Sequence, residues 1–133
     1  MYNIFIGWDS REQDAYKVCE HTLRKHSTVE LNIVPLKRDS LIKEGLYTRD
    51  EGGNVSTEFA YTRFLTPYLA GYKGWSLFID CDFLFTRDVG ELFGLADPQY
   101  AAMCVQHDYT PSEATKMDGQ KQVAYPRKNW SSC

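Results

Sequence analysis

Two aspartates, Asp80 and Asp82, follow a short apolar segment over residues 75–79. Aromatic and branched residues in a run of this length are typical of a buried strand. Because side chains alternate along an extended strand, Asp80 and Asp82 are expected on one face, roughly 6–7 Å apart. Carboxylates this close repel each other, and a divalent cation relieves the repulsion. Carboxylate oxygens suit Mg²⁺ or Mn²⁺, and two protein ligands leave positions that diphosphate oxygens can fill.

The same spacing also occurs in ordinary turns after strands, so the pair alone is a weak signal. Apolar residues make up 43% of the 133-residue chain and charged residues 25%, which is typical of a globular domain. The net charge of −3 and the lack of a basic run argue against a nucleic-acid surface. The N-terminus carries neither a signal peptide nor a transmembrane segment, and the four cysteines lack zinc-type spacing. We therefore expect a cytoplasmic protein with reduced thiols.

The N-terminal third predicts a βαβ unit. Residues 2–7 and 31–36 have the composition of strands, and Pro35 is expected near the end or at an edge of the second strand. Apolar residues at helical spacing predict a helix that ends near His26. Ser10 and Gln13 have the spacing of a capping box at its start. A strand, a helix and a strand at this spacing indicate a parallel pair with a right-handed crossover.

The middle of the chain predicts the elements that carry the two aspartates. We expect a short helix within residues 39–46 and a longer helix over residues 56–69. Pro67 is expected to kink the longer helix or to end its regular hydrogen bonding, which would free the carbonyl of Arg63. Further elements follow: a glycine-bracketed turn at residues 71–74, the strand that leads to Asp82, a helix at 88–95 capped by Asp88, a strand at 100–106 and an irregular segment at 109–127.

Two of these motifs together resemble a known family. The segment Tyr61–Leu69 carries an arginine, Arg63, among aromatic residues and Pro67, and the segment Leu77–Asp82 is an apolar strand ending in Asp-x-Asp. In this order they resemble glycosyltransferase family 8 and its bacterial relatives, which have the GT-A fold. The resemblance implies a Rossmann-like α/β fold, with a mainly parallel sheet and helices on both faces. Residues 1–133 would form one nucleotide-sugar-binding domain, the N-terminal part of a longer enzyme.

The resemblance also implies roles for individual residues. Asp80 and Asp82 would hold Mn²⁺ or Mg²⁺ against the diphosphate of a nucleotide sugar. Asp9 would contact the base, and Trp8 would supply the flat surface that a tyrosine provides in the family. Arg63 would lie near the diphosphate or the sugar.

The end of the chain carries a weaker part of the resemblance. Asn129 begins the segment Asn129–Ser132, which is similar to the family's Asn-Ser-Gly stretch at the sugar site, with serine in place of glycine. The family's later histidine, a third metal ligand, has no counterpart after Asn129. The implied activity is transfer of a hexose from a UDP-linked donor to a glycan, lipid-linked or protein acceptor. Self-association through a sheet edge near Cys133 is a further expectation.

Simpler interpretations stand beside these. Asp9 would serve equally well as a helix cap, Arg63 as a solvated helix residue, and Trp8 as part of the core. Haloacid dehalogenase-type phosphatases also carry Asp-x-Asp after an apolar strand, with the first aspartate as nucleophile, which would be Asp80. Their motif lies on the first strand and continues with Thr or Val where this chain has Leu84. A non-catalytic nucleotide-binding fragment is the third alternative.

Overall fold

The helices and strands of the described residues all lie in the first 97 residues. The computed structural model describes residues 1–50, 55–105 and 115. Residues 1–97 form one compact unit, and a second unit begins at Pro98. None of the helices in this described part is long and apolar enough to cross a bilayer.

The N-terminal third folds into the predicted βαβ unit. β1 spans Tyr2–Gly7 and β2 spans Leu31–Leu36, as the sequence predicts. α1 spans Gln13–His26 between them. The two strands pair in parallel, and β2 lies at the edge of the sheet. Pro35 is the penultimate residue of this edge strand, where its missing N–H is tolerated.

The predicted capping box at the start of α1 is wrong. Glu12, not Ser10, precedes the helix, and no side chain caps this end. The Ser10 hydroxyl donates to the Glu58 carboxylate at 2.5 Å instead. The Gln13 amide donates to the backbone oxygen of Ser10 at 3.0 Å. The helix therefore begins later than predicted, because a contact distant in sequence takes the hydroxyl that the cap requires.

The predicted helix over residues 56–69 is wrong in its first half. Residues 56–61 form bends and turns, followed by the 3₁₀ helix η1 at Thr62–Leu65 and the short helix α3 at Thr66–Leu69. Pro67 lies in the first turn of α3, where no intrahelical N–H is required, so it begins a helix and does not kink one. The Arg63 carbonyl is not freed, because it accepts the Thr66 N–H.

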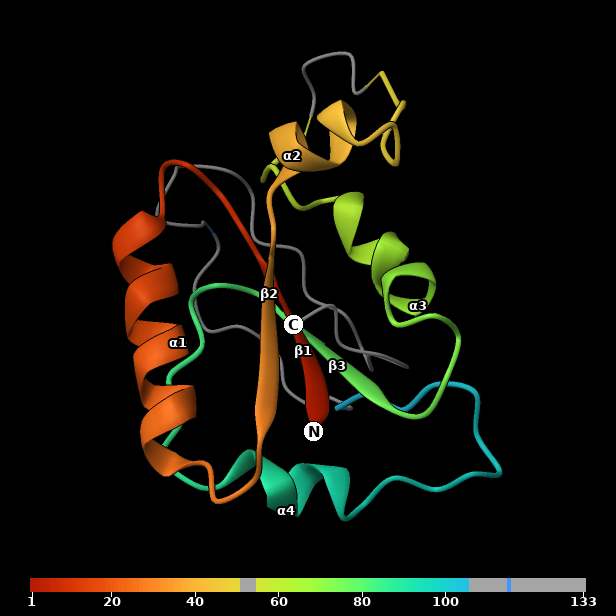
Figure 1. Cartoon of the computed structure of the whole chain (residues 1–133). Helices are drawn as coiled ribbons and strands as arrows, with labels where there is room; N and C mark the ends of the chain where they lie inside the picture. Colours follow the sequence, from red (N-terminus) through yellow and green to blue (C-terminus); the bar gives the residue numbers. More distant parts are fainter. Residues whose placement is uncertain (51–54, 106–114, 116–133) are drawn as a thin grey trace. The chain divides into compact units, whose positions relative to one another are not determined.

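β3 spans Ser76–Ile79 and pairs in parallel with β1, which gives the strand order β2-β1-β3. Gly71 and Gly74, both with positive φ, form the turn before β3. α2, at Arg38–Lys43, follows β2 close to the predicted position. Figure 1 shows α1 on one side of the strands and α3 on the other. The strand order changes direction between β1 and β3, and ligands bind at the carboxyl ends of strands at such a point.

The core lies between α1 and the sheet. α1 contributes Tyr16, Cys19 and Leu23, whereas Val18 is half exposed. The cluster of buried residues consists of Ile4, Ile6, Tyr16, Cys19, Leu23, Phe59, Ile79, Cys81 and Val89. Cys81 belongs to this cluster, so the residue between the two aspartates anchors them to the core.

The segments after β3 follow the prediction only in part. Phe83 and Phe85 pack against the core cluster. α4, at Val89–Phe93, is capped by Asp88, whose Oδ1 accepts the Gly90 N–H at 2.8 Å. The strand predicted at 100–106 is wrong over residues 100–105, whose side chains are exposed and which have no strand beside them within the described residues. Gln106, the segment 109–127 and Asn129 lie outside the described residues.

Gly7 ends β1 against the face of the Phe59 ring. A Cβ atom added at Gly7 would lie 2.6 Å from two carbons of that ring. We therefore expect Gly7→Ala to lower the free energy of unfolding by about 1–3 kcal/mol, through overpacking of a buried aromatic side chain. Urea titration of Gly7→Ala, Phe59→Ala and the double variant measures this cost. If Gly7→Ala is as costly with Phe59 absent as with it present, the proposed clash is wrong.

Candidate metal and nucleotide site

The two aspartates follow β3 in a turn and do not continue the strand. β3 ends at Ile79, and Cys81 and Asp82 form a turn. Cys81 is fully buried, Asp80 is partly buried and Asp82 is exposed. The predicted strand up to Asp82 is therefore wrong in its last three residues. The turn is explained by the Cys81 side chain, which belongs to the core cluster.

Asp80 is the partly buried acid of the site. Its Oδ1 is buried and has no hydrogen-bond partner within the described part of the chain. Burial raises its pKa to about 6, against an opposing effect of Arg63, and the nearby Asp82 and Glu12 raise it further. A buried carboxylate oxygen without a hydrogen bond costs free energy, which a bound cation offsets. Asp80 is therefore the candidate for such a cation among the described residues of the turn.

Arg63 provides the counter-charge for Asp80. Its Nη2 lies 3.5 Å from Asp80 Oδ1, and the Arg63 side chain is only 17% exposed. The guanidinium lies over the rings of Phe59 and Phe78, at 5.4 and 5.1 Å from their centres. Its Nε donates to the Phe59 carbonyl at 3.3 Å. Arg63 is therefore not a solvated helix residue. η1 places it beside the turn at residues 80–82, which we call the acidic turn.

Asp9 forms a closed set of hydrogen bonds. The Arg11 side chain binds it with two donors, Nε to Oδ1 at 2.8 Å and Nη2 to Oδ2 at 2.6 Å. The backbone N–H groups of Arg11 and Glu58 donate to the same carboxylate. Asp9 is fully buried, and these bonds, chiefly the one from the Arg11 side chain, lower its pKa to about 2. It neither caps α1 nor presents a free oxygen to a nucleobase.

Trp8 is partly buried at the end of β1, and other side chains contact its ring. Tyr16 meets it edge-on at 4.9 Å between ring centres. The Lys37 ammonium lies 4.1 Å from the ring centre. Trp8 is packed against the core, as the simpler interpretation has it, and Lys37 covers a ring face that a base would need.

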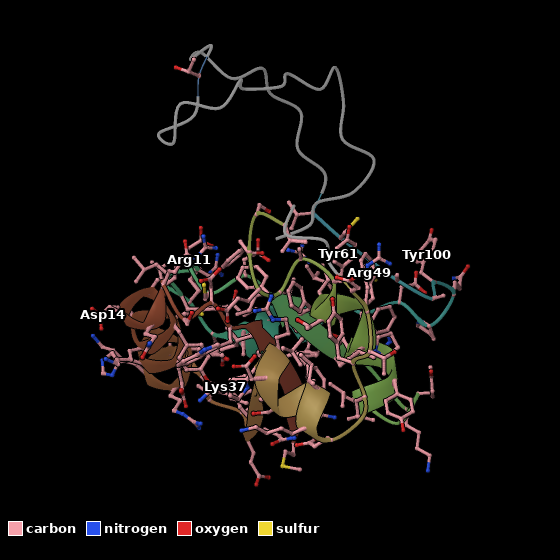
Figure 2. The ribbon with its side chains drawn as sticks, turned by 90° about the horizontal axis from the view of Figure 1, so that it is seen from above. Arg11, Asp14, Lys37, Arg49, Tyr61 and Tyr100 are labelled. Carbon is pink, nitrogen blue, oxygen red and sulfur yellow. The ribbon has the colours of Figure 1, made fainter. Side chains whose placement is uncertain are left out.

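Three basic side chains, Arg11, Lys37 and Arg49, follow β1, β2 and α2 in the chain. Figure 2 shows them at separate places in the view from above, with Arg49 beside Tyr61. The Arg49 guanidinium lies 3.9 Å from the centre of the Tyr61 ring. Each of the three contacts an aromatic ring or a carboxylate, which orders a long side chain and reduces the entropy lost when an anion binds.

Glu12 is a site residue that the sequence did not single out. The Cys81 thiol donates to its Oε2 at 3.2 Å, which places this carboxylate beside the acidic turn. The position of Glu12 is evident only from its contact with Cys81, because the local sequence gives Glu12 no feature beyond its place near a helix start. No three histidine, cysteine or carboxylate side chains of the described residues form a metal-binding group. Asp80 and Asp82 would therefore need ligand oxygens to complete a coordination shell.

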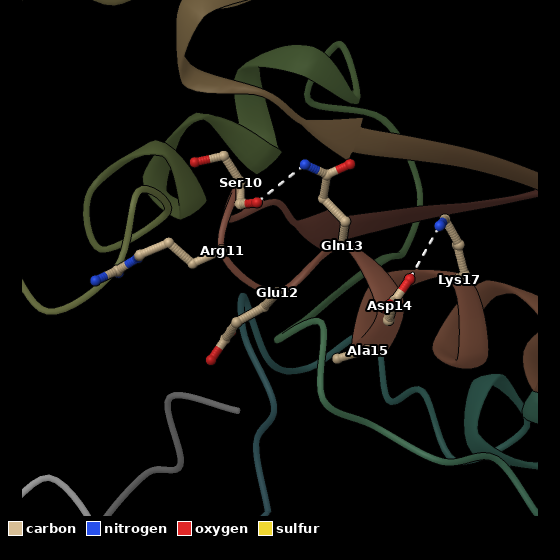
Figure 3. A pocket seen from close by; sticks show the side chains of 7 residues that line it. All are labelled: Ser10, Arg11, Glu12, Gln13, Asp14, Ala15 and Lys17. Atoms are coloured by element: carbon tan, nitrogen blue, oxygen red, sulfur yellow. Dashed lines mark hydrogen bonds and ion pairs between the residues drawn. The ribbon is translucent and has the colours of Figure 1, made fainter.

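An open pocket of about 530 Å³ lies at the start of α1. It is lined by Ser10, Arg11, Glu12, Gln13, Asp14, Ala15 and Lys17. Figure 3 shows Arg11 and Glu12 extending away from α1, whereas Asp14 and Lys17 form an ion pair along it, at 3.0 Å. Glu12 lines this pocket and also accepts the Cys81 thiol, so one side chain links the pocket to the acidic turn.

Comparison with known proteins gives one informative match. The chain is 55% identical over 131 residues to Protein CDI of Arabidopsis thaliana, covering 98% of this chain and 51% of that protein. It thus spans about half the length of the curated relative it matches. No family model matches the chain, and no solved structure matches it. The name of the relative states no activity.

The buried Asp9–Arg11 pair predicts a pH dependence of stability. Because the folded pKa of Asp9, about 2, lies below its ordinary value of 3.8, its contribution is present above pH 3.8 and is lost as the pH falls toward 2. Arg11 is 67% exposed, so we expect about 1 kcal/mol and not the full ~2.5 kcal/mol of the shift. Urea titrations at pH 6 and pH 2.5 measure it in the wild type and in Asp9→Asn. An identical pH dependence in the two proteins would contradict the role given to this pair.

Proposed function

We propose that this chain is the nucleotide-binding part of a metal-dependent glycosyltransferase of the GT-A type. In this proposal Asp80 and Asp82 hold Mn²⁺ or Mg²⁺, and the donor is a nucleotide-diphosphate sugar, UDP-linked as the family resemblance implies. The observation that supports it best is the buried Oδ1 of Asp80, which lacks a hydrogen-bond partner within the described residues. A hard divalent cation satisfies such an oxygen and removes its repulsion from Asp82.

The position of the acidic turn supports the same proposal. The turn follows β3 next to the carboxyl end of β1, where the strand order of the parallel sheet changes direction. Open parallel sheets bind nucleotides at this point. The turn also has a cationic neighbour in Arg63 and adjoins the pocket that Arg11 lines. These features suit a doubly charged phosphate ligand.

The chemistry follows from the charges of the site. A bound cation would stabilise the negative charge that develops on the departing nucleoside diphosphate. Arg63, held by the Phe59 carbonyl and two aromatic rings, keeps a positive charge next to Asp80. Its guanidinium matches the geometry of phosphate oxygens.

The acceptor belongs to the glycan, lipid-linked or protein classes that the resemblance implies. A cytoplasmic location fits the cysteines, since Cys19 and Cys81 are free buried thiols. Thiols persist in reducing compartments. Burial raises the pKa of Cys19 to about 11 and of Cys81 to about 12, so these two are unreactive core residues.

Metal-dependent binding of UDP tests the proposal. We expect Mn²⁺ to strengthen UDP binding to the wild-type chain by at least about tenfold over binding in a chelator, since the cation bridges the aspartates and the diphosphate. Asp80→Asn and Asp82→Asn should each abolish this enhancement. Isothermal titration calorimetry measures it, and circular dichroism confirms folding. Asp39→Asn, an exposed aspartate on α2, is the matched control and should bind as the wild type does.

Two results would contradict the proposal. One is equal UDP affinity with Mn²⁺ and with chelator, which would remove the metal from the site. The other is metal-dependent hydrolysis of an aryl phosphate that is lost in Asp80→Asn, because this result would favour the phosphatase alternative with Asp80 as nucleophile.

A further inference from the structure

Arg11 is held in one orientation by a buried acid. Its Nε and Nη2 bind the two oxygens of Asp9, and Nη2 also donates to the Ser56 carbonyl at 2.9 Å. Asp9 is fully buried, whereas the Arg11 side chain is 67% exposed. The buried Asp9 carboxylate therefore fixes the orientation of the Arg11 guanidinium, which faces solvent. Bidentate pairs of this kind fix geometry as well as charge.

This arrangement leaves part of the guanidinium available to a ligand. Arg11 Nη1 has no hydrogen-bond partner among the residues that the structure describes. The ion pair with Asp9 already orders the Arg11 side chain. Binding of an anion to Nη1 therefore costs little further side-chain entropy. Arg11 is thus prepared to bind an anion in the pocket that it lines.

The other charges of the pocket make Arg11 its available cation. Lys17, the second basic residue of the lining, is paired with Asp14. Glu12 is negative and accepts the Cys81 thiol, so it lies toward the acidic turn. An anion in the pocket therefore needs Arg11, and a cation on Asp80 and Asp82 would offset Glu12.

We infer that Arg11, positioned by Asp9, binds the diphosphate of the nucleotide donor in the pocket at the start of α1. The inference rests on the proposed function for the identity of the ligand. It changes the role of Asp9: the family resemblance gives that residue a contact with the base, whereas here its oxygens are occupied by Arg11 and the Glu58 N–H. Asp9 is a positioning residue, and Arg11 is the residue that contacts the ligand.

The test compares ligands with and without phosphate groups. Pyrophosphate, UDP and uridine are titrated into the wild type and Arg11→Gln by calorimetry, each in Mn²⁺ and in chelator. We expect Arg11→Gln to weaken pyrophosphate and UDP by about tenfold to a hundredfold, the worth of charge-assisted hydrogen bonds. Uridine binding should not change. The enhancement by Mn²⁺ should persist in Arg11→Gln, because it depends on Asp80 and Asp82.

Two further variants keep the result interpretable. Arg11→Gln leaves Asp9 buried without its counter-charge, so Asp9→Asn/Arg11→Gln supplies a neutral pair if the single variant does not fold. Arg24→Gln is the matched control, because Arg24 is an exposed arginine of α1 that is paired with Glu20 at 2.8 Å. It should bind all ligands as the wild type does.

The outcomes separate this inference from the proposed function. Wild-type affinity for pyrophosphate in Arg11→Gln or the double variant would overturn the inference, as would an equal loss for uridine and UDP. If Mn²⁺ does not strengthen UDP binding to the wild type, the proposed metal site is wrong. If Arg11→Gln still weakens pyrophosphate binding in that case, Arg11 remains an anion-binding residue.

Discussion

The site depends on the desolvation of one carboxylate. Asp80 leaves β3 at the point where the neighbouring Cys81 side chain enters the core, and this holds the Asp80 oxygen in a partly buried position. Its raised pKa reflects that burial first, and then the balance between Arg63 and two nearby acids. A carboxylate held in this way favours any cation that reaches it. The burial of Asp80 is therefore a consequence of how the end of β3 is anchored.

The groups around this carboxylate are positioned by a chain of contacts that begins at Gly7. The absence of a side chain at Gly7 lets the Phe59 ring lie against the end of β1. The Phe59 carbonyl accepts a hydrogen bond from Arg63 Nε, and the Phe59 ring lies under the Arg63 guanidinium. Arg63 in turn forms an ion pair with Asp80. The neighbouring Glu58 backbone N–H donates to Asp9, which in turn binds the Arg11 side chain. Two arginines are thus positioned by the residues that end β1.

Much of this fold could be predicted because local pattern and tertiary packing agree. β1 and β2 have the composition of strands, α1 has helical spacing of apolar residues, and Asp88 caps α4 through its immediate neighbours. The failures have tertiary causes. The Ser10 hydroxyl contacts Glu58 in place of α1, and the apolar run after Tyr100 is exposed with no adjacent strand in the described residues. Apolar spacing alone could not show either outcome.

The same division holds for the candidate site. Spacing and order pointed to Asp80, Asp82 and Arg63, and the structure brings Arg63 to within 3.5 Å of Asp80. The roles of Arg11 and Glu12 could not be predicted, because they depend on Asp9 being buried and on a thiol 69 positions away in sequence. For Asp9, the family resemblance implies a contact with the base, which is a different role. Residues of one local motif can be found from sequence, whereas partners supplied by the fold cannot.

A search for a bound ion in crystals decides whether Asp80 and Asp82 hold a metal. Crystals of the chain soaked with Mn²⁺ and UDP would reveal the ion by its anomalous scattering. We expect an anomalous peak within ~2.2 Å of carboxylate oxygens of both Asp80 and Asp82 and of oxygens of the UDP diphosphate. Bound UDP with no anomalous peak at these aspartates, or with its diphosphate elsewhere, would contradict it.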